Sequence, residues 1–388
     1  MKNSTNLTLA GGVFALFIAM GVGRFAYTPI LPLMQHAVGF SSLVAGNIAS
    51  ANYLGYLAGA ILASIIPWGN QRGYYLKVSI IISLVTTCLM GLTNSLIFWL
   101  AIRFISGCSS SVTFVLSSSV IIDLLNREHK QTLIGLFYSG VGLGIAFTGL
   151  AVPWLNSYFG WQGAWIGLAV ISSFFAVIPL VGISKHNSIG TASSSTDKAM
   201  QNESISVSSL IVAYGLQGFG YVITGTFLVA ILRDMFEATF ISSSSWVIVG
   251  LAAAPSCYLW AQLANRIGYT NGLMAAYILQ AVAVILPVFK PDIAGALIGS
   301  LFFGGTFMGI TTMANALIRN LKPENSSKFI GYLTAAYGLG QILGPLAAGY
   351  LFDLTNSFNV PLTIAFAALI LGLAILMAGS VFKRRISS

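Results

Sequence analysis

An arginine inside the first apolar segment of the chain is the residue best suited to bind a ligand. Arg24 lies in the stretch MGVGRFAYTPILPLMQ, about where the middle of a lipid bilayer would be. A charge at that depth costs roughly 2.5–3.5 kcal/mol on insertion scales, so such residues usually face a cavity and mark functional sites. Gly21 and Gly23 would allow a neighbouring helix to approach closely, and Pro29 and Pro32 each remove a backbone donor. The alternative is that Arg24 only joins two helices through backbone carbonyls.

A second arginine, Arg103, also lies inside an apolar segment, and no such segment has a carboxylate near its centre. Charged groups deep in a membrane usually have a partner, and here the chain offers no evident one. A guanidinium presents a pair of parallel donors that suits a carboxylate or phosphate. We therefore expect Arg24, alone or together with Arg103, to bind an anionic substrate.

The composition identifies the surroundings of these arginines as a membrane. Of 388 residues, 56% are hydrophobic and 7% are charged, and the mean hydropathy is +0.87; a soluble domain has about 25% charged residues. The net charge of +9 is spread over short loops, which argues against a nucleic-acid partner. An enzyme would need a nucleophile–base pair, paired carboxylates or a metal cluster, and the apolar segments carry no His, Asp or Glu near their centres. We therefore expect neither an enzyme nor a cofactor or metal.

The apolar segments predict an all-α membrane protein with twelve transmembrane helices. A helix needs about 20 apolar residues to span a bilayer. Lys and Arg residues of the loops gather on one side, with Arg233 and Lys290 as exceptions, so both termini are expected to be cytoplasmic. The expected spans are residues 9–34, 43–66, 76–93, 96–124, 132–154, 162–183, 208–231, 244–264, 271–289, 293–318, 329–351 and 361–381.

One long polar linker divides these spans into six and six. Residues 184–207 are rich in Ser, Thr and Asn and show no apolar periodicity, which is typical of a flexible segment. The predicted domains are therefore an N-terminal six-helix bundle, residues 1–183, and a C-terminal six-helix bundle, residues 208–388.

The two predicted bundles resemble each other in sequence. The tripeptide GLG at 142–144 in the fifth span recurs at 338–340 in the eleventh, and Arg24 in the first span aligns with Tyr221 in the seventh. Because each half has an even number of spans, the second half enters the membrane from the same side and in the same orientation as the first. A parallel repeat of this kind predicts a substrate site between the halves near the middle of the membrane.

The candidate substrate ligands are polar or aromatic residues of the spans that should face this site. Residues three, four and seven apart share one helix face, which defines a stripe around each arginine and on the matching spans of the other half. For each polar group taken alone, an interhelical hydrogen bond worth roughly 0.6 kcal/mol is the alternative interpretation. The candidates are Arg24, Tyr27, Thr28, Arg103, Tyr138, Gln217, Tyr221, Thr224, Asn315, Tyr337 and Gln341.

Two local motifs resemble those of the major facilitator superfamily. Residues 103–107, RFISG, resemble the Arg-x-x-x-Gly core of its fourth-helix motif, and residues 261–268, AQLANRIG, resemble its loop motif Gly-x-Leu-Ala-Asp-Arg-x-Gly, with Ala and Asn replacing the first Gly and the Asp. The counterpart loop at 67–73 has no acid, whereas a carboxylate there helps hold the halves of the family's members together. By this resemblance the expected gating residues are Asp123, Asn265, Arg266 and Gly268.

The sharpest resemblance is at the first span. Residues 21–32, GVGRFAYTPILP, resemble the first helix of the bacterial YbfB-like subgroup. The resemblance implies two six-helix bundles related by a parallel pseudo-repeat, secondary transport of a small solute by alternating access, a monomeric state and a place in the bacterial cytoplasmic (inner) membrane. Export of amphipathic compounds, or a non-transporting membrane sensor on the same fold, are the alternatives that the sequence leaves open.

Overall fold

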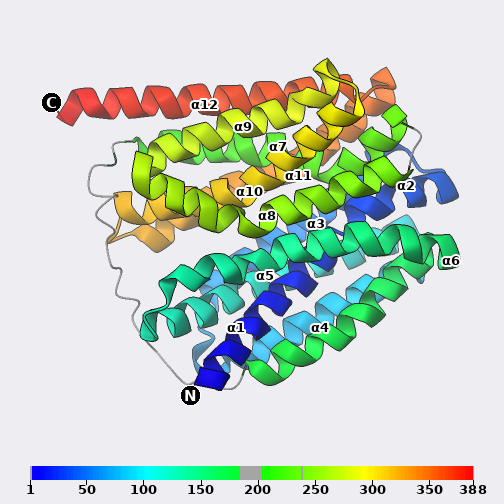
Figure 1. The fold of residues 1–388 in the computed structure, drawn as a ribbon, viewed down its shortest axis with the longest axis horizontal. Coiled ribbons are helices and arrows are strands. Elements are labelled where there is room, and N and C mark those ends of the chain that lie inside the picture. The colour runs from blue at the N-terminus through cyan, green and yellow to red at the C-terminus, as the bar shows by residue number, and fades with distance from the viewer. Residues whose placement is uncertain (1, 184–202, 204, 237–238, 388) are drawn as a thin grey trace.

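The computed structural model describes residues 2–183, 203, 205–236 and 239–387, and these form helices and short connections without a β-strand. The helices run broadly from left to right in Figure 1. Their bounds are α1 Lys2–Leu16, η1 Phe17–Val22, α2 Tyr27–Val38, α3 Ser42–Ile65, η2 Gly69–Gln71, α4 Arg72–Met90, α5 Leu96–Arg127, η3 Gln131–Leu133, α6 Ile134–Gly182, α7 Val207–Phe236, α8 Thr239–Ile267, α9 Tyr269–Phe289, α10 Ile293–Leu321, α11 Ser326–Thr355 and α12 Asn359–Ser387.

Ten helical segments of the described chain are long and apolar enough to cross a membrane. Two predicted spans, 132–154 and 162–183, lie in the single segment Gln131–Gly182, where Gly160 interrupts helical geometry with a φ of 67°. The predicted span 329–351 lies in α11, which is not among the ten. The all-helical membrane fold is therefore confirmed, whereas the number of twelve spans stays a prediction.

The first predicted span is broken at its centre, although the sequence pattern predicts one continuous segment. Gly23 N–H donates to Ile18 O at 2.8 Å and Phe25 N–H to Met20 O at 3.1 Å, five residues back, so this stretch is a π-helix followed by a turn at 23–26. Pro29 has no N–H to offer Phe25 O, and Thr28 N–H takes its place at 3.3 Å. As a result, the carbonyl that Thr28 N–H would bind in a regular helix, Arg24 O, is left to another donor. Single π turns of this kind often occur at functional sites.

In Figure 1, α1, α4, α5 and α6 lie in the lower part and α7–α12 in the upper part, while α2, at the right, and α3, in the middle, lie level with α8. The groups α1–α6 and α7–α12 meet where α6 packs on α8, α3 on α11, and α2 on α7. Glycines make these approaches close: a Cβ on Gly142 would lie 2.3 Å from Ala254 N, and one on Gly46 would lie 2.3 Å from Pro345 O. The first GLG tripeptide therefore lies at one contact between the groups. In the second GLG tripeptide, Gly338 faces Leu57 of α3.

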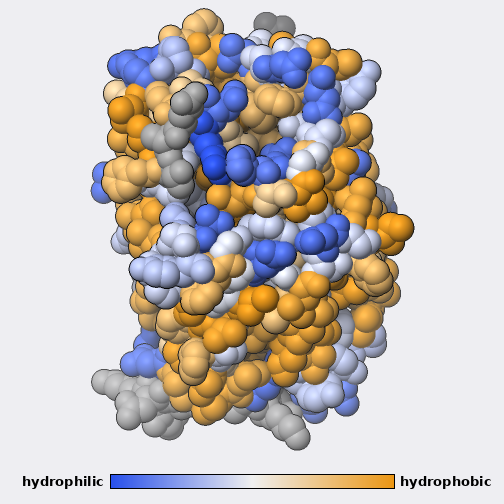
Figure 2. All heavy atoms as spheres, turned by 90° about the vertical axis from the view of Figure 1, so that its right-hand side faces the viewer, coloured by the Kyte–Doolittle hydropathy of each residue, from blue (hydrophilic) through white to orange (hydrophobic). Residues whose placement is uncertain are grey.

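The flanks of the molecule carry large apolar side chains in the open. Ile97, Phe174 and Phe240 are 77%, 73% and 82% exposed. Figure 2 shows the end of the molecule at the right of Figure 1, with hydrophilic side chains gathered in its upper middle and apolar atoms along both flanks. In a soluble protein such apolar area would mark a binding surface, and around a bundle of membrane-spanning length it is the surface that meets lipid.

Candidate functional site

Arg103 donates its hydrogen bonds to the broken first span. On α5 it is 2% exposed, and it donates from Nη1 to Gly23 O at 3.0 Å and from Nη2 to Arg24 O at 3.2 Å. Ser106 Oγ adds a third bond, to Gly23 O at 3.2 Å. Asn52 Nδ2 in turn donates to Arg103 O at 2.9 Å and ties α5 to α3. Arg103 thus supplies donors to the carbonyls that the π turn and Pro29 leave without regular helical partners.

Arg24 is as buried as Arg103 but has different neighbours. Its Cζ lies 4.1 Å from the ring centroid of Tyr56, 4.8 Å from that of Tyr53 and 5.4 Å from that of Phe25. Nε and Nη2 are buried without a hydrogen-bond partner among the described residues, and within that part of the chain no carboxylate forms an ion pair with it. Contact with aromatic faces contributes about 2 kcal/mol when the cation is desolvated, which leaves these two nitrogens free for an acceptor.

The rings around Arg24 are positioned by close packing of α3 on α5. A Cβ on Gly107 would lie 2.0 Å from Asn52 O, and one on Gly55 would lie 2.0 Å from Phe104 O. The two helices can approach this closely only because both positions lack a side chain. Tyr53 and Tyr56 are three residues apart and therefore share the face of α3 that is turned toward Arg24.

Opposite Arg24, the C-terminal helices present an aromatic wall. Tyr214 and Tyr337 stack with centroids 4.4 Å apart and an interplanar angle of 13°, and Tyr337 and Tyr221 stack at 5.7 Å and 8°. The wall reaches the first span through Phe307, whose ring meets Phe25 edge-on at 6.0 Å. Phe307 in turn stacks on Tyr221, with centroids 6.0 Å apart and an interplanar angle of 5°. We define the wall as Tyr214, Tyr221, Phe303, Phe307 and Tyr337.

Polar groups lie beside the wall. Gln341 Nε2 donates to the hydroxyl of Tyr221 at 2.5 Å, while Gln341 Oε1 and Thr224 Oγ1 are buried without a partner in the described part of the chain. Thr28 Oγ1 donates to Gly225 O at 2.6 Å and so joins α2 to α7. The structure therefore brings predicted residues of both halves to one interface: Arg24, Thr28, Tyr221, Thr224, Tyr337 and Gln341.

Four other predicted ligands have protein partners of their own. Tyr27 donates to Ala45 O at 3.0 Å, and Asn315 Nδ2 bonds to Thr311 O at 2.8 Å within its own helix. The other two, Tyr138 and Gln217, bond to Ser118 Oγ at 3.4 Å and to Gln280 Oε1 at 2.9 Å. The interhelical hydrogen bond that was the alternative interpretation describes Tyr27, Tyr138 and Gln217 in this structure, whereas the bond of Asn315 lies within α10.

Of the expected gating residues, Asp123 is the one with an ion pair. Its Oδ2 lies 3.4 Å from Arg72 Nη1, which also donates to Ser119 Oγ at 2.9 Å. Asn265 and Arg266 are exposed at the end of α8, and Gly268 adopts a φ of +90° between α8 and α9. Thus, although the loop at 67–73 has no acid, its arginine, Arg72, forms an ion pair with the carboxylate of Asp123 on α5.

Glu128, the residue that follows α5, links this end of α5 to α1. It accepts hydrogen bonds from Lys130 Nζ at 3.1 Å and Thr5 Oγ1 at 3.2 Å. These bonds, chiefly the one from Lys130, lower the pKa of the Glu128 carboxyl.

Sequence reasoning missed a carboxylate that joins the two groups of helices. Asp353 near the end of α11 accepts from Ser42 N–H and Leu43 N–H at 3.0 Å each, the first residues of α3. A carboxylate at a helix N-terminus satisfies free backbone donors and complements the helix dipole. Tyr53 OH and Thr226 Oγ1 lie 3.4 Å apart across the same interface. Asp353 looks like a loop acid in the sequence because its partner is a backbone more than 300 residues away.

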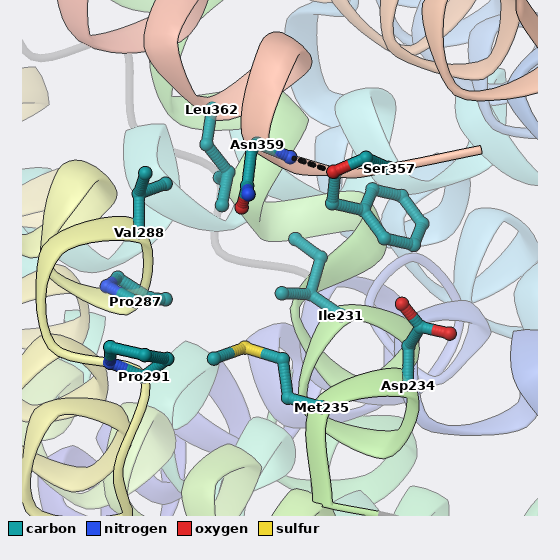
Figure 3. A pocket seen from close by; sticks show the side chains of 10 residues that line it. Ile231, Asp234, Met235, Pro287, Val288, Pro291, Ser357, Asn359 and Leu362 are labelled. Atoms are coloured by element: carbon teal, nitrogen blue, oxygen red, sulfur yellow. Dashed lines mark hydrogen bonds between the residues drawn. The ribbon is translucent and has the colours of Figure 1, made fainter. Parts of the chain in front are cut away.

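Figure 3 shows a cavity of about 240 Å³ at the outer ends of α7 and α9. Asp234 and Met235 border it from α7 and Pro287 from α9, and Ser357 Oγ accepts from Asn359 N–H at 3.2 Å beside it. None of the predicted substrate ligands lines this cavity.

The helical architecture, the lipid-facing flanks and a buried site between two groups of helices define a membrane transporter of the major facilitator type. The chain belongs to the family described as uncharacterised MFS-type transporter YbfB, whose model matches residues 16–377. This confirms the resemblance seen in the first span, and with it that the protein is a transporter and not an enzyme.

Relatives agree over nearly the full length. The chain is 22% identical over 371 residues to the inner membrane transport protein YdhP of Escherichia coli K12, covering 92% of each chain. It is 26% identical over 388 residues to the uncharacterized transporter YycB of Bacillus subtilis 168, covering 92% of this chain and 89% of that one. The fold matches the crystal structure of a mutant of the nucleoside transporter NupG with a TM-score of 0.74, 14% identity, and coverage of 96% of this chain and 99% of that one.

Proposed function

We propose that the protein is a secondary transporter that moves a small organic anion, with Arg24 as the ligand of the anionic group. The observation that carries this proposal is a guanidinium that is 4% exposed, with Nε and Nη2 unpartnered among the described residues. Removing one member of a buried charge pair costs about 3–5 kcal/mol, so a lone buried arginine gains strongly from an incoming carboxylate. The neighbouring rings leave the edge of the guanidinium, where its N–H groups point, available for that acceptor.

Transport would proceed by alternating access between residues 1–183 and 208–388. Three contacts support this division, because each joins one half to the other: Asp353 to the start of α3, Thr28 to Gly225, and Tyr53 to Thr226. Asp353 lies near the end of α11, and its contact would have to break for a substrate to enter from that side. In this account Arg24 and Tyr221 occupy equivalent positions of the repeat and face each other across the moving interface.

The distribution of Lys and Arg supports cytoplasmic termini, and we propose that the protein works as a monomer in the bacterial inner membrane. The end that carries the Asp353 contact would then face the outside. Cysteines introduced at exposed positions such as Val38 and Arg266 test this orientation. Labelling of the first from outside and of the second only after permeabilisation is expected, and the reverse pattern would refute the orientation.

A flux assay in proteoliposomes tests the function. Wild type, Arg24→Lys, Arg24→Gln and the control Arg319→Gln, which changes an exposed arginine at the end of α10, would be assayed for counterflow of radiolabelled carboxylates. We expect saturable counterflow in wild type and the control, partial loss with Lys, and loss with Gln. If Arg24→Gln transports an identified anion as well as wild type, the proposal is wrong.

Export of amphipathic compounds is the second candidate function, and the aromatic wall is the observation that favours it. The same vesicles discriminate the two. Uncharged amphiphiles would compete for an exporter site, whereas they would leave an Arg24-dependent anion flux unchanged.

A further inference from the structure

We infer that the transported anion carries a planar aromatic ring, so that its carboxylate binds Arg24 and its ring stacks on the aromatic wall. The inference rests on the proposed function and names the substrate class of that site. It requires that the wall present flat faces, that it lie next to Arg24, and that polar groups be free where ring substituents would lie.

The rings of the wall are nearly parallel. Tyr221 lies at 5° to Phe307 and at 19° to Phe303, and these two phenylalanines lie at 22° to each other. The phenylalanines of the N-terminal half are oriented in several ways: Phe14 and Phe175 stack at 14°, whereas Phe17 and Phe175 meet at 64° and Phe147 and Phe175 at 84°. Tilted and edge-to-face pairs fill space in all directions, whereas parallel rings offer a common plane of stacking to a planar ligand.

The rings of the wall also overlap incompletely. Tyr221 is 6.0 Å from Phe307 and 5.7 Å from Tyr337, centroid to centroid. Parallel rings in direct contact are only about 3.5–4.0 Å apart across their faces, so these pairs are displaced sideways. Tyr221 and Phe307 are buried, at 2% and 3% exposure, so the ring of a ligand would stack on the wall only after the two halves move apart.

The wall and Arg24 are contiguous but belong to different halves. Phe25, the residue next to Arg24, contacts Phe307 edge-on, and Phe307 stacks on Tyr221. An arylcarboxylate can contact both at once, with its charge on the N-terminal half and its ring on the C-terminal half. A short aliphatic anion would satisfy Arg24 and leave the wall without a partner.

The free polar groups indicate which ring substituents the site prefers. Gln341 Oε1 can only accept a hydrogen bond, and Thr224 Oγ1 can accept or donate. A site with unpaired buried polar groups favours the ligand that pairs them over the analogue that cannot. A hydroxyl or N–H on the ring should therefore strengthen binding.

Thermal stabilisation of the purified full-length protein by matched ligands tests the inference. Benzoate and cyclohexanecarboxylate share a charge and differ in the ring, benzoate and benzamide share the ring and differ in charge, and 4-hydroxybenzoate adds a donor. We expect benzoate to bind about two- to twelvefold more tightly than cyclohexanecarboxylate, since stacking contributes about 0.5–1.5 kcal/mol beyond buried area. We expect 4-hydroxybenzoate to bind more tightly still, and benzamide not to bind.

Variants identify the groups responsible. Phe307→Leu should abolish the preference for benzoate over cyclohexanecarboxylate while both still bind, Phe307→Tyr should keep the preference, and Arg24→Gln should abolish binding of both. Phe307→Tyr retains a ring, so it remains informative if Phe307→Leu fails to fold.

The possible failures are distinguishable. Equal binding of benzoate and cyclohexanecarboxylate, lost in Arg24→Gln, would overturn the aromatic inference and leave the proposed function standing. Binding of benzamide as tight as that of benzoate and unchanged in Arg24→Gln would overturn the proposed function and with it the assignment of an anion. Failure of all the carboxylates to stabilise the wild type would overturn the aromatic inference, and the counterflow assay with aliphatic carboxylates would then decide the proposed function separately.

Discussion

Arg24 and Arg103 are two arginines of one interface with different relations to the protein around them. Both are almost fully buried, at 4% and 2% exposure, and neither forms an ion pair among the described residues. Arg103 donates from Nη1 and Nη2 to backbone carbonyls and leaves only Nε without an acceptor in that part of the chain, whereas both Nε and Nη2 of Arg24 have none there. The role of a buried charge is therefore decided by its neighbours and not by its residue type or depth.

The two arginines are also linked. One of the carbonyls that Arg103 binds is that of Arg24 itself, at 3.2 Å. The turn at 23–26 exposes that carbonyl because the π turn and Pro29 displace the regular helical bonds. Arg103 therefore fixes the backbone that carries Arg24, and we regard it as a positioning residue, while Arg24 is left to contact the substrate.

Arg103→Met should have the largest effect on folding. It would leave Arg24 O without its guanidinium donor and Gly23 O with Ser106 Oγ alone, and a buried unsatisfied group costs about 1–3 kcal/mol. We expect a marked fall in the thermal unfolding temperature of the detergent-solubilised protein and a low yield from membranes. An unfolding temperature equal to that of wild type would remove the distinction between the arginines.

Arg24→Met should leave the unfolding temperature close to that of wild type or raise it. The substitution removes a buried charge that lacks a hydrogen-bonded partner and loses contacts with two rings worth about 1–2 kcal/mol. The measurement is the same melting curve, recorded beside that of Arg103→Met. A fall as large as that of Arg103→Met would show that Arg24 is structural too.

Asp353→Asn should weaken the contact between α11 and the start of α3. The amide has one acceptor oxygen for the two N–H groups of Ser42 and Leu43, and it has no charge to complement the helix dipole. We expect about a two- to fivefold faster labelling of a cysteine placed at Ser50, which lies in the same interface. Asp292→Asn, in an exposed loop, is the matched control; equal labelling in both would show that Asp353 does not hold this end closed.

Tyr138→Phe should have the smallest effect. Its hydroxyl makes a long bond of 3.4 Å to Ser118 Oγ, and its ring packs against Phe114 and Phe137. We expect counterflow within about twofold of wild type, because such bonds contribute roughly 0.6 kcal/mol. A loss comparable to that of Arg24→Gln would place Tyr138 in the substrate site.

Part of the fold and of the site could be predicted from the sequence because it depends on local pattern. The length of the apolar segments predicted the membrane helices, and the spacing of charge identified Arg24 as a residue without an ion-pair partner. The repeat paired Arg24 with Tyr221, and Phe307 contacts both Tyr221 and Phe25, the residue next to Arg24. These inferences need only the helical period and the cost of charge in lipid.

The features of the site that could not be predicted from the sequence depend on which helices pack against each other. The role of Asp353 becomes visible only when α11 is known to pack on α3. The contact of Tyr53 and Tyr56 with Arg24 depends on the close approach of α3 to α5 that Gly55 and Gly107 allow. The different roles of Arg24 and Arg103 follow from the break in the first predicted span. The glycines and prolines of that span only suggested where the break would be.

Calorimetric titration of a carboxylate into wild type, Arg24→Lys and Arg24→Gln tests the central claim most directly, with Arg319→Gln as the matched control. The account predicts that affinity falls in the order wild type, Lys, Gln, with a loss of about a hundredfold for Gln, since charge-assisted hydrogen bonds contribute about 1.5–3 kcal/mol, and no change in the control. Dissociation constants that are equal for wild type and Arg24→Gln would contradict it.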